Sequence, residues 1–206
     1  FQKALAAGPG SPERARYIFR EGRGEHGELP PSDWTSIFGG PAWTRVTEPD
    51  GTPGQWYLHL FDPSQPDLDW TNPQVREDFE TTLRFWLDRG VDGFRLDAIN
   101  FMMHEPTMRD NPPAPDTGKT RTRPFDFQLK LYNQSHADIV PFLERIRATL
   151  DEYGDRFTVA EVGGDEADRE MKLFTASDHR LNTAYGFDFL YADRLTPRIV
   201  AEAVAK

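Results

Sequence analysis

Two successive apolar strands, each preceded by an amphipathic helix, constrain this chain more than any other feature of its sequence. Helical periodicity at 72–89 leads into a short strand at 93–97, and a second helix at 139–150 leads into a strand at 156–162. Strands separated by helices are parallel strands joined by crossover connections. The pattern therefore predicts an α/β fold, and a doubly wound sheet and a barrel both remain open at this point.

The first of these helices has clear boundaries. Asn72 is a suitable N-cap, Pro73 suits the first helical position, and Gly90 supplies a C-terminal stop. The buried face is expected to carry Val75, Phe79, Leu83, Trp86 and Leu87. Further along, the sequence predicts a loop at 103–127, a helix at 166–175, a strand at 184–191 and a helix that starts near Pro197.

Residues 1–70 have a different texture, because glycine and proline turns interrupt them repeatedly. Two extended runs, 42–47 and 55–61, flank a Gly-containing loop and predict a β-hairpin. We interpret 1–70 as an irregular small domain or as an excursion from a larger one. The chain opens at Phe1, and its last residues, 199–206, read as the middle of a helix, so we expect a slice of a longer protein.

The composition excludes several classes of function. The chain has 24 Lys and Arg against 34 Asp and Glu, a net charge of −10, which repels nucleic-acid phosphates and anionic membranes. It has no cysteine, so disulfides, thiolate metal sites and cysteine nucleophiles are ruled out. No apolar run approaches the ~18 residues of a membrane span, and no signal-peptide pattern stands at the start, so we expect no membrane partner and a cytoplasmic location.

Both strands end in a carboxylate. Asp97 closes the first strand and Glu161 the second, and the carboxyl ends of parallel strands meet at one edge of a sheet. Arg95 points to the same side as Asp97 and can hold that carboxylate ionised. The alternatives are a structural Arg95–Asp97 pair, a helix-start role for Glu161, and Mg²⁺ binding. Mg²⁺ binding weighs less, because the next acid, Asp188, falls inside its predicted strand.

One aspartate and one glutamate are also the pair that cleaves a glycosidic bond. At a separation of about 5–5.5 Å, one attacks the anomeric carbon and the other protonates the leaving oxygen. Arg95 beside Asp97 favours Asp97 as the ionised nucleophile and Glu161 as the acid. The 15 Phe and 5 Trp of the chain suit a sugar site, since aromatic rings pack against the apolar faces of pyranoses.

Several short motifs together resemble the α-amylase family of glycoside hydrolases, family 13. The stretch GFRLDA at 93–98 is similar to the second signature region of that family, AEV at 160–162 to the third, and QPDLDW at 65–70 to the fifth. Two further stretches, SIFGGPAW at 36–43 and WYLHLF at 56–61, resemble the oligo-1,6-glucosidase and α-glucosidase branch.

The resemblance implies part of a TIM (β/α)₈ barrel with an irregular α+β domain B excursion. Residues 1–70 would be that excursion, and 71–206 would be the central, incomplete portion of the catalytic barrel. It also implies that Asp97 is the nucleophile, that Glu161 is the acid/base, and that Arg95 binds the glucose near its 2-hydroxyl.

Three further residues are implied as substrate-binding. Phe38 and Phe61 match phenylalanines that line the glucose pocket, and an ordinary core position is the alternative for both. Ala98 resembles enzymes that prefer α-1,4 bonds, since relatives that cut α-1,6 bonds tend to carry valine there.

The chain departs from the family pattern at several points. Asp69 stands where asparagine is usual, and Ala160 where glycine commonly precedes the acid/base. Nothing matches the first region, the fourth region with its third catalytic carboxylate, or the calcium loop, so we expect no metal site and no cofactor in this chain. His136 and His179 lack the family context and are expected at the surface.

These observations lead to one hypothesis about function, with alternatives. We expect a retaining, exo-acting α-glucosidase that removes α-1,4-linked glucose from short malto-oligosaccharides such as maltose through a covalent glucosyl-enzyme. An α-glucosyl transferase or an oligo-1,6-glucosidase of the same family is the first alternative. A non-catalytic barrel that acts as a binding or partner subunit is the alternative of another class. Residues 1–206 alone are expected to be inactive, because the third carboxylate is missing.

Overall fold

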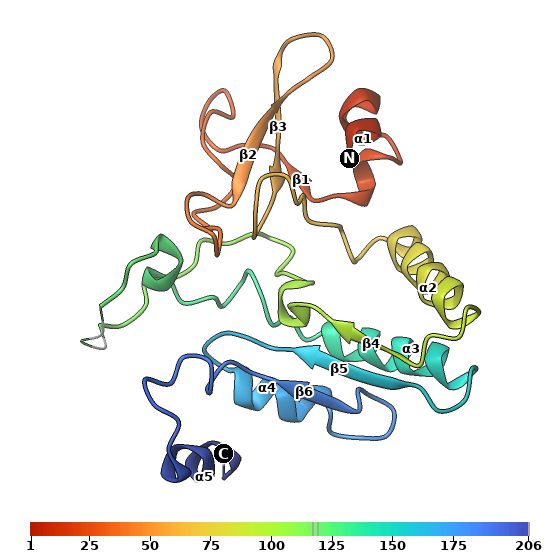
Figure 1. Ribbon diagram of the computed structural model, residues 1–206. Coiled ribbons are helices and arrows are strands. Elements are labelled where there is room, and N and C mark those ends of the chain that lie inside the picture. The colour runs from red at the N-terminus through yellow and green to blue at the C-terminus, as the bar shows by residue number, and fades with distance from the viewer. Residues whose placement is uncertain (117, 119, 206) are drawn as a thin grey trace. The chain divides into compact units, whose positions relative to one another are not determined.

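The computed structural model describes residues 1–116, 118 and 120–205, and Thr117, Lys119 and Lys206 lie outside the described part. The described chain divides into two compact units, each with its own three-stranded sheet (Figure 1).

The N-terminal unit comprises Phe1–Phe79 and Phe101–His136, and the C-terminal unit comprises Glu80–Asn100 and the chain from Ala137 onward. The stretch at 103–127, which the sequence predicts as a loop, therefore belongs with the N-terminal segment. The sequence pattern alone gives no sign of this association.

The N-terminal unit contains an antiparallel sheet in the order β1–β3–β2. Its strands are β1 (Phe19–Arg20), β2 (Trp43–Thr47) and β3 (Pro53–Leu58). The predicted hairpin is confirmed, because β2 and β3 pair antiparallel with Trp43 opposite Leu58. Three short helices, absent from the sequence prediction, accompany the sheet: α1 (Gln2–Ala7), η1 (Arg14–Arg16) and η3 (Pro124–Phe127).

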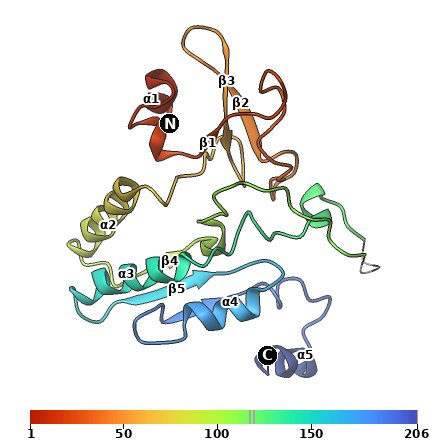
Figure 2. The ribbon, with the colours of Figure 1, turned by 180° about the vertical axis from the view of Figure 1, so that it is seen from behind.

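The C-terminal unit contains a parallel sheet in the order β4–β5–β6. Its strands are β4 (Gly93–Leu96), β5 (Phe157–Glu161) and β6 (Thr183–Tyr185). Its helices are α3 (Ile139–Asp151), α4 (Ala167–Phe174) and α5 (Pro197–Val204), and α2 (Pro73–Leu87) and η2 (Ile99–Phe101) cross the boundary between the units. Helices α3 and α4 lie on the same side of the sheet, in front of it in Figure 2. The predicted parallel α/β arrangement is confirmed, although the described strands form two partial sheets and no closed barrel.

Apolar periodicity explains how α3 packs. Its buried face carries Ile139, Phe142, Leu143, Ile146 and Leu150, as the spacing predicts. Gly154 follows the helix with φ of +80°, a conformation that glycine adopts without the steric cost of a Cβ. Among the described residues, no helix combines the length and the apolar character that crossing a bilayer requires.

Helix α2 begins and ends where the sequence predicts. The Asn72 side chain accepts a hydrogen bond from the backbone N–H of Gln74, and Gly90 has φ of +84°. Of the predicted buried face, Val75, Leu83 and Leu87 are buried and Phe79 is partly buried. The prediction is wrong for Trp86, which is 48% exposed. Val75, Phe79, Leu83 and Leu87 recur every four residues along one face of the helix, and Trp86 lies beside that face.

The last predicted strand, 184–191, is also wrong in extent. Strand β6 ends at Tyr185, and the chain then turns, with the backbone N–H of Tyr191 donating to the carbonyl of Phe187. Within this turn the rings of Phe187 and Tyr191 stack with centroids 5.7 Å apart. Asp188 consequently lies in a turn after the strand and not inside it.

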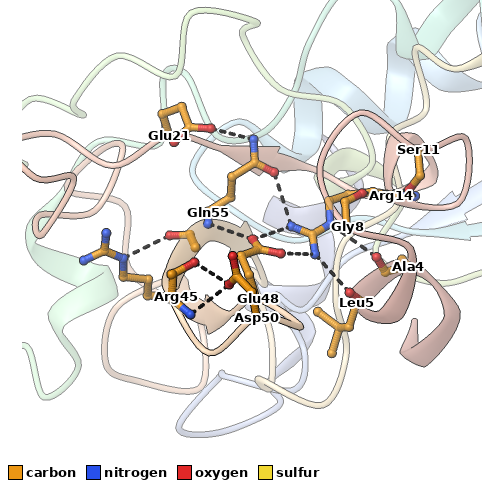
Figure 3. A network of polar contacts seen from close by, with 12 residues as sticks. Ala4, Leu5, Gly8, Ser11, Arg14, Glu21, Arg45, Glu48, Asp50 and Gln55 are labelled. Carbon is orange, nitrogen blue, oxygen red and sulfur yellow. Dashed lines mark hydrogen bonds and ion pairs between the residues drawn. The ribbon is translucent and has the colours of Figure 1, made fainter.

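A buried ion pair fastens the N-terminal helix to the hairpin (Figure 3). The Arg14 guanidinium is 3% exposed and donates to both carboxylate oxygens of Glu48, at 2.7 and 2.9 Å. It also donates to the backbone carbonyls of Ala4 and Leu5 and lies 4.5 Å from the centroid of the Phe19 ring. Bidentate charge-assisted hydrogen bonds of this kind are among the strongest in proteins.

A second polar contact closes the loop that follows β3. Asp67, in the QPDLDW stretch, accepts a hydrogen bond from the backbone N–H of Leu60 at 2.9 Å, and its own backbone N–H donates to the carbonyl of Leu58. Burial raises the pKa of Asp67 to about 7, because the charged form loses its hydration. The carboxyl group is therefore protonated in the folded chain at mildly acidic pH.

We expect Arg14→Ala to lower the free energy of unfolding by about 3–5 kcal/mol, because Glu48 would be left as a buried, uncompensated charge. The matched control is Arg23→Ala. Arg23 pairs with Asp110 at 2.8 Å, but both side chains are about half exposed, so its loss should cost less than about 1 kcal/mol. Urea unfolding of the complete protein measures both values, and equal losses would contradict the role given to Arg14.

We expect Asp67→Asn to remove a pH dependence of stability. Because the pKa of Asp67 is raised, the folded chain binds the proton more tightly than the unfolded chain does. The contribution of this proton to stability is therefore complete below about pH 4 and is lost as the pH rises towards about 7. The loss amounts to up to about 4 kcal/mol, and the asparagine variant should not show it.

The control for this test is Asp62→Asn. Hydrogen bonds from Ser64 lower the pKa of Asp62, so its contribution has the opposite sign and is lost as pH falls. Thermal unfolding between pH 4 and 8 compares the three proteins. An unchanged pH dependence in Asp67→Asn would show that Asp67 does not hold the proton.

Candidate active site

The two carboxylates predicted from the strand ends are neighbours at one end of the parallel sheet. Leu96 of β4 pairs with Ala160 of β5, so the next residues, Asp97 and Glu161, stand side by side where the two strands finish. Strand residues alternate between faces, and Ala160 is fully buried while Glu161 is not. The strand register therefore brings together two acids that are far apart in the sequence.

One guanidinium joins these two acids. Nη2 of Arg95 lies 2.8 Å from Oδ1 of Asp97 and also forms an ion pair with Oε2 of Glu161. Two oxygens that contact a single nitrogen can be separated by no more than about two hydrogen-bond lengths, about 6 Å. The predicted pairing of Arg95 with Asp97 is confirmed, and the same cation also serves Glu161.

The two carboxylates differ in their surroundings. The Glu161 side chain is 19% exposed and the Asp97 side chain is 72% exposed. A hydrogen bond with Tyr185 and the negative charges of Asp97 and Glu161 raise the pKa of Arg95 above its usual range, so the guanidinium stays charged. The site therefore combines a permanent positive charge with one solvent-exposed acid, Asp97, and one largely buried acid, Glu161.

The loops that follow the two acids are fixed to each other. Asn100 is fully buried, and its side-chain N–H donates to the backbone carbonyl of Gly163 at 2.6 Å. Between Asp97 and Asn100 the backbone turns sharply, with Ala98 at φ of +43°. Few residues other than glycine adopt that conformation, and it is a frequent property of functional sites.

Phe38 and Phe61, the predicted pocket residues, belong to the N-terminal unit. Their rings meet edge to face with centroids 5.6 Å apart, and Phe61 also packs on Phe101. The hydroxyl of Ser36 accepts from the backbone N–H of Phe38 and donates to the carbonyl of Phe61. Phe38 is 69% exposed, so the alternative of an ordinary core position is wrong for this residue.

Two structural features bear on the alternative roles of the two acids. The helix-start role for Glu161 is wrong, because α4 begins six residues later, at Ala167. Within residues 1–116, 118 and 120–205, no three His, Cys, Asp or Glu side chains are grouped as a metal site would require. His179 is exposed as expected, whereas His136 is partly buried.

Two residues of the site were missed by sequence reasoning. Tyr185 donates a hydrogen bond to Glu161 and accepts one from Arg95, and Asn100 ties the two loops together. The predicted strand at 184–191 already contained Tyr185, but its register with Glu161 requires the sheet pairing. For Asn100, the sequence offered only its position three residues after Asp97 as a sign that it belongs to the site.

Known proteins resemble this chain over most of its length. Residues 1–203 match the alpha-amylase family, which is described as "Alpha amylase, catalytic domain". A probable alpha-glucosidase of Rhizobium meliloti (strain 1021) is 43% identical over 181 residues, which cover 85% of this chain and 32% of that protein. An oligo-1,6-glucosidase of Parageobacillus thermoglucosidasius is 37% identical over 185 residues, covering 89% and 30%.

A solved structure agrees with these relatives. The α-glucosyl transfer enzyme XgtA superposes with a TM-score of 0.88 at 35% identity, covering 100% of this chain and 38% of its own. The chain thus spans about a third of the length of the curated relatives that it matches. The family match, the strand-end acids and their shared arginine agree, and the chain belongs to the α-amylase family of glycoside hydrolases as a portion of its catalytic domain.

Proposed function

We propose that the complete protein is a retaining, exo-acting α-glucosidase that acts on α-1,4-linked gluco-oligosaccharides such as maltose. The observation that carries this proposal is the contact of Arg95 Nη2 with carboxylate oxygens of both Asp97 and Glu161. It keeps the two carboxyl groups within about 6 Å. That spacing suits retaining enzymes, in which the acids stand about 5–5.5 Å apart, and is shorter than the range of inverting enzymes.

Asp97 is the nucleophile in this mechanism. Its carboxylate is the more open of the two and forms an ion pair with Arg95 at 2.8 Å. It attacks C1 of the terminal glucose, the bond from C1 to the glycosidic oxygen breaks, and Glu161 gives its proton to that oxygen. The products of this step are a β-glucosyl ester on Asp97 and a shortened sugar with a new hydroxyl group.

The second step releases glucose. Glu161, now a carboxylate, takes a proton from water while the water oxygen attacks C1 and the ester bond to Asp97 breaks. If a sugar hydroxyl replaces the water, the same chemistry transfers the glucosyl group. The likeness to XgtA, which is named for α-glucosyl transfer, supports transfer as the second candidate, and the ratio of free glucose to transfer products separates the two.

A binding or partner subunit without activity is the rival of another class. Both acids and the arginine are present and in contact, which such a subunit does not need. We also propose that Phe38 and Phe61 line the glucose pocket, supported by their edge-to-face contact and by the 69% exposure of Phe38.

The domain assignment extends the same proposal. Residues 1–70 would form the domain B excursion, and 71–206 the central part of the barrel, supported by the antiparallel hairpin in the first and the parallel sheet in the second. A cytoplasmic location is part of the proposal, and imaging of the tagged complete protein tests it.

We expect Asp97→Gly and Glu161→Gly to be rescued by azide with different products. Without its nucleophile, the enzyme lets azide attack C1 directly and forms β-glucosyl azide. Without its acid/base, the glucosyl-enzyme still forms from an activated aryl glucoside, and azide then gives α-glucosyl azide. Each variant alone should lose about 10²–10⁴-fold or more of its maltose activity.

The anomers of the azide products are distinguished by proton NMR. The same anomer from both variants, or retained activity on maltose in Asp97→Gly, would overturn the assignment of roles. Asp188→Gly is the control, because that acid lies in the turn after β6 and should leave maltose activity in place.

We expect Ala98→Val to move the preference from maltose towards isomaltose, because the larger side chain narrows the space beside the cleaved bond. The variant should also be less stable by about 1–3 kcal/mol, since a β-branched residue is strained at a φ of +43°. Ala98→Gly is the matched control, because glycine adopts this φ freely. The measurement is the ratio of kcat/KM for the two disaccharides, and an unchanged ratio in Ala98→Val would rule out a role in linkage choice.

A further inference from the structure

Tyr185 places its hydroxyl group against the two charged partners of the site. It ends β6 directly opposite Glu161 in the parallel register. Its Oη accepts a hydrogen bond from Nε of Arg95 at 2.9 Å and donates one to Oε2 of Glu161 at 2.8 Å. Three strands thus contribute one residue each to a closed ring of contacts: Arg95 from β4, Glu161 from β5 and Tyr185 from β6.

The direction of these hydrogen bonds is fixed by the chemistry of the donors. A guanidinium has no acceptor atom, so the N–H of Arg95 must donate to the Tyr185 oxygen. The single hydroxyl proton of Tyr185 is then left for Glu161. Oε2 of Glu161 receives two donors, Tyr185 and Nη2 of Arg95. None of the described residues hydrogen-bonds the other oxygen, Oε1.

We propose that Tyr185 is a positioning residue for the acid/base, holding Oε2 of Glu161 so that Oε1 carries the proton that reaches the glycosidic oxygen. This inference rests on the proposed α-glucosidase function. Rotation of the carboxyl group would present the wrong oxygen to the substrate, and two donors on Oε2 prevent it. After the proton has left, the same two donors stabilise the carboxylate that activates water in the second step.

A purely structural role for Tyr185 would use its ring and not its hydroxyl. The ring packs loosely, with its centroid 6.4 Å from that of Phe187 and 6.0 Å from the Arg95 guanidinium carbon. Phenylalanine would keep both contacts. The hydroxyl is therefore the group that ties Tyr185 to the chemistry, and Tyr185→Phe isolates its effect.

The experiment compares Tyr185→Phe with wild type in the complete protein on two substrates. Maltose has a poor leaving group, which needs the proton from Glu161, and 2,4-dinitrophenyl α-glucoside has a good leaving group, which does not. We expect kcat/KM for maltose to fall about tenfold, the size of one hydrogen bond to a charged group, and that for the aryl glucoside to fall less than about threefold. The alkaline limb of the maltose pH profile should move to higher pH, because the ionised carboxylate loses a donor.

Tyr153→Phe is the matched control. Its hydroxyl also donates to a carboxylate, that of Asp88 at 2.9 Å, but after α3 and away from the strand ends that carry the acids. Loss of this hydroxyl group should leave kcat/KM for both substrates and the pH profile unchanged.

The outcomes separate this inference from the proposed function. The proposed function, and the role of Tyr185 with it, would be overturned by either of two results. The wild-type protein could be inactive on both substrates, or the Asp97→Asn variant could be as active as wild type. Active wild type with inactive Asp97→Asn supports the proposed function. In that case, equal losses on both substrates, or no loss, in Tyr185→Phe would overturn the positioning role alone.

Discussion

The candidate site depends on one cation held between two carboxylates. Asp97 and Glu161 end neighbouring parallel strands, and two negative charges at that distance would repel each other without a partner. The guanidinium of Arg95, which belongs to β4 two residues before Asp97, contacts both. An arginine suits this place better than a lysine, because its planar fork reaches several acceptors at once and its charge persists at every physiological pH. The arrangement of the acids, their proposed roles and the hydroxyl of Tyr185 all follow from where that guanidinium lies.

Backbone packing sets the distances on which this contact relies. Gly93 begins β4 so close to β5 that a Cβ on it would overlap the carbonyl oxygen of Phe157, so only glycine allows the two strands to approach in this way. At the other end of the strands, buried Asn100 holds the loop after Asp97 to the carbonyl of Gly163. The strand spacing and the loop contact together leave the acids little freedom to separate. Preorganisation of this kind is what electrostatic catalysis requires, because groups already in place need no rearrangement during the reaction.

Local patterns in the sequence were enough to predict much of the fold. Helical spacing identified α2 and α3, and strand ends identified Asp97 and Glu161, because these features depend on neighbours a few residues away. Features that depend on distant pairing were missed. The hydrogen bonds of Tyr185 to Glu161 require the register of β5 and β6, and the Arg14–Glu48 ion pair joins residues 34 positions apart. The errors at Trp86 and at the end of β6 arose where aromatic residues outside the core imitated the periodicity of buried ones.

The central claim is that Asp97 forms a covalent bond to glucose. Incubation of the complete protein with 5-fluoro-α-glucosyl fluoride should trap that intermediate. The fluorine at C5 slows both its formation and its breakdown, and the good fluoride leaving group restores the rate of formation alone. Mass spectrometry of the proteolysed protein should find one added fluoroglucosyl group, on the peptide that contains Asp97. A label on another residue, or steady turnover of α-glucosides with no trapped adduct and with inverted product, would contradict the account.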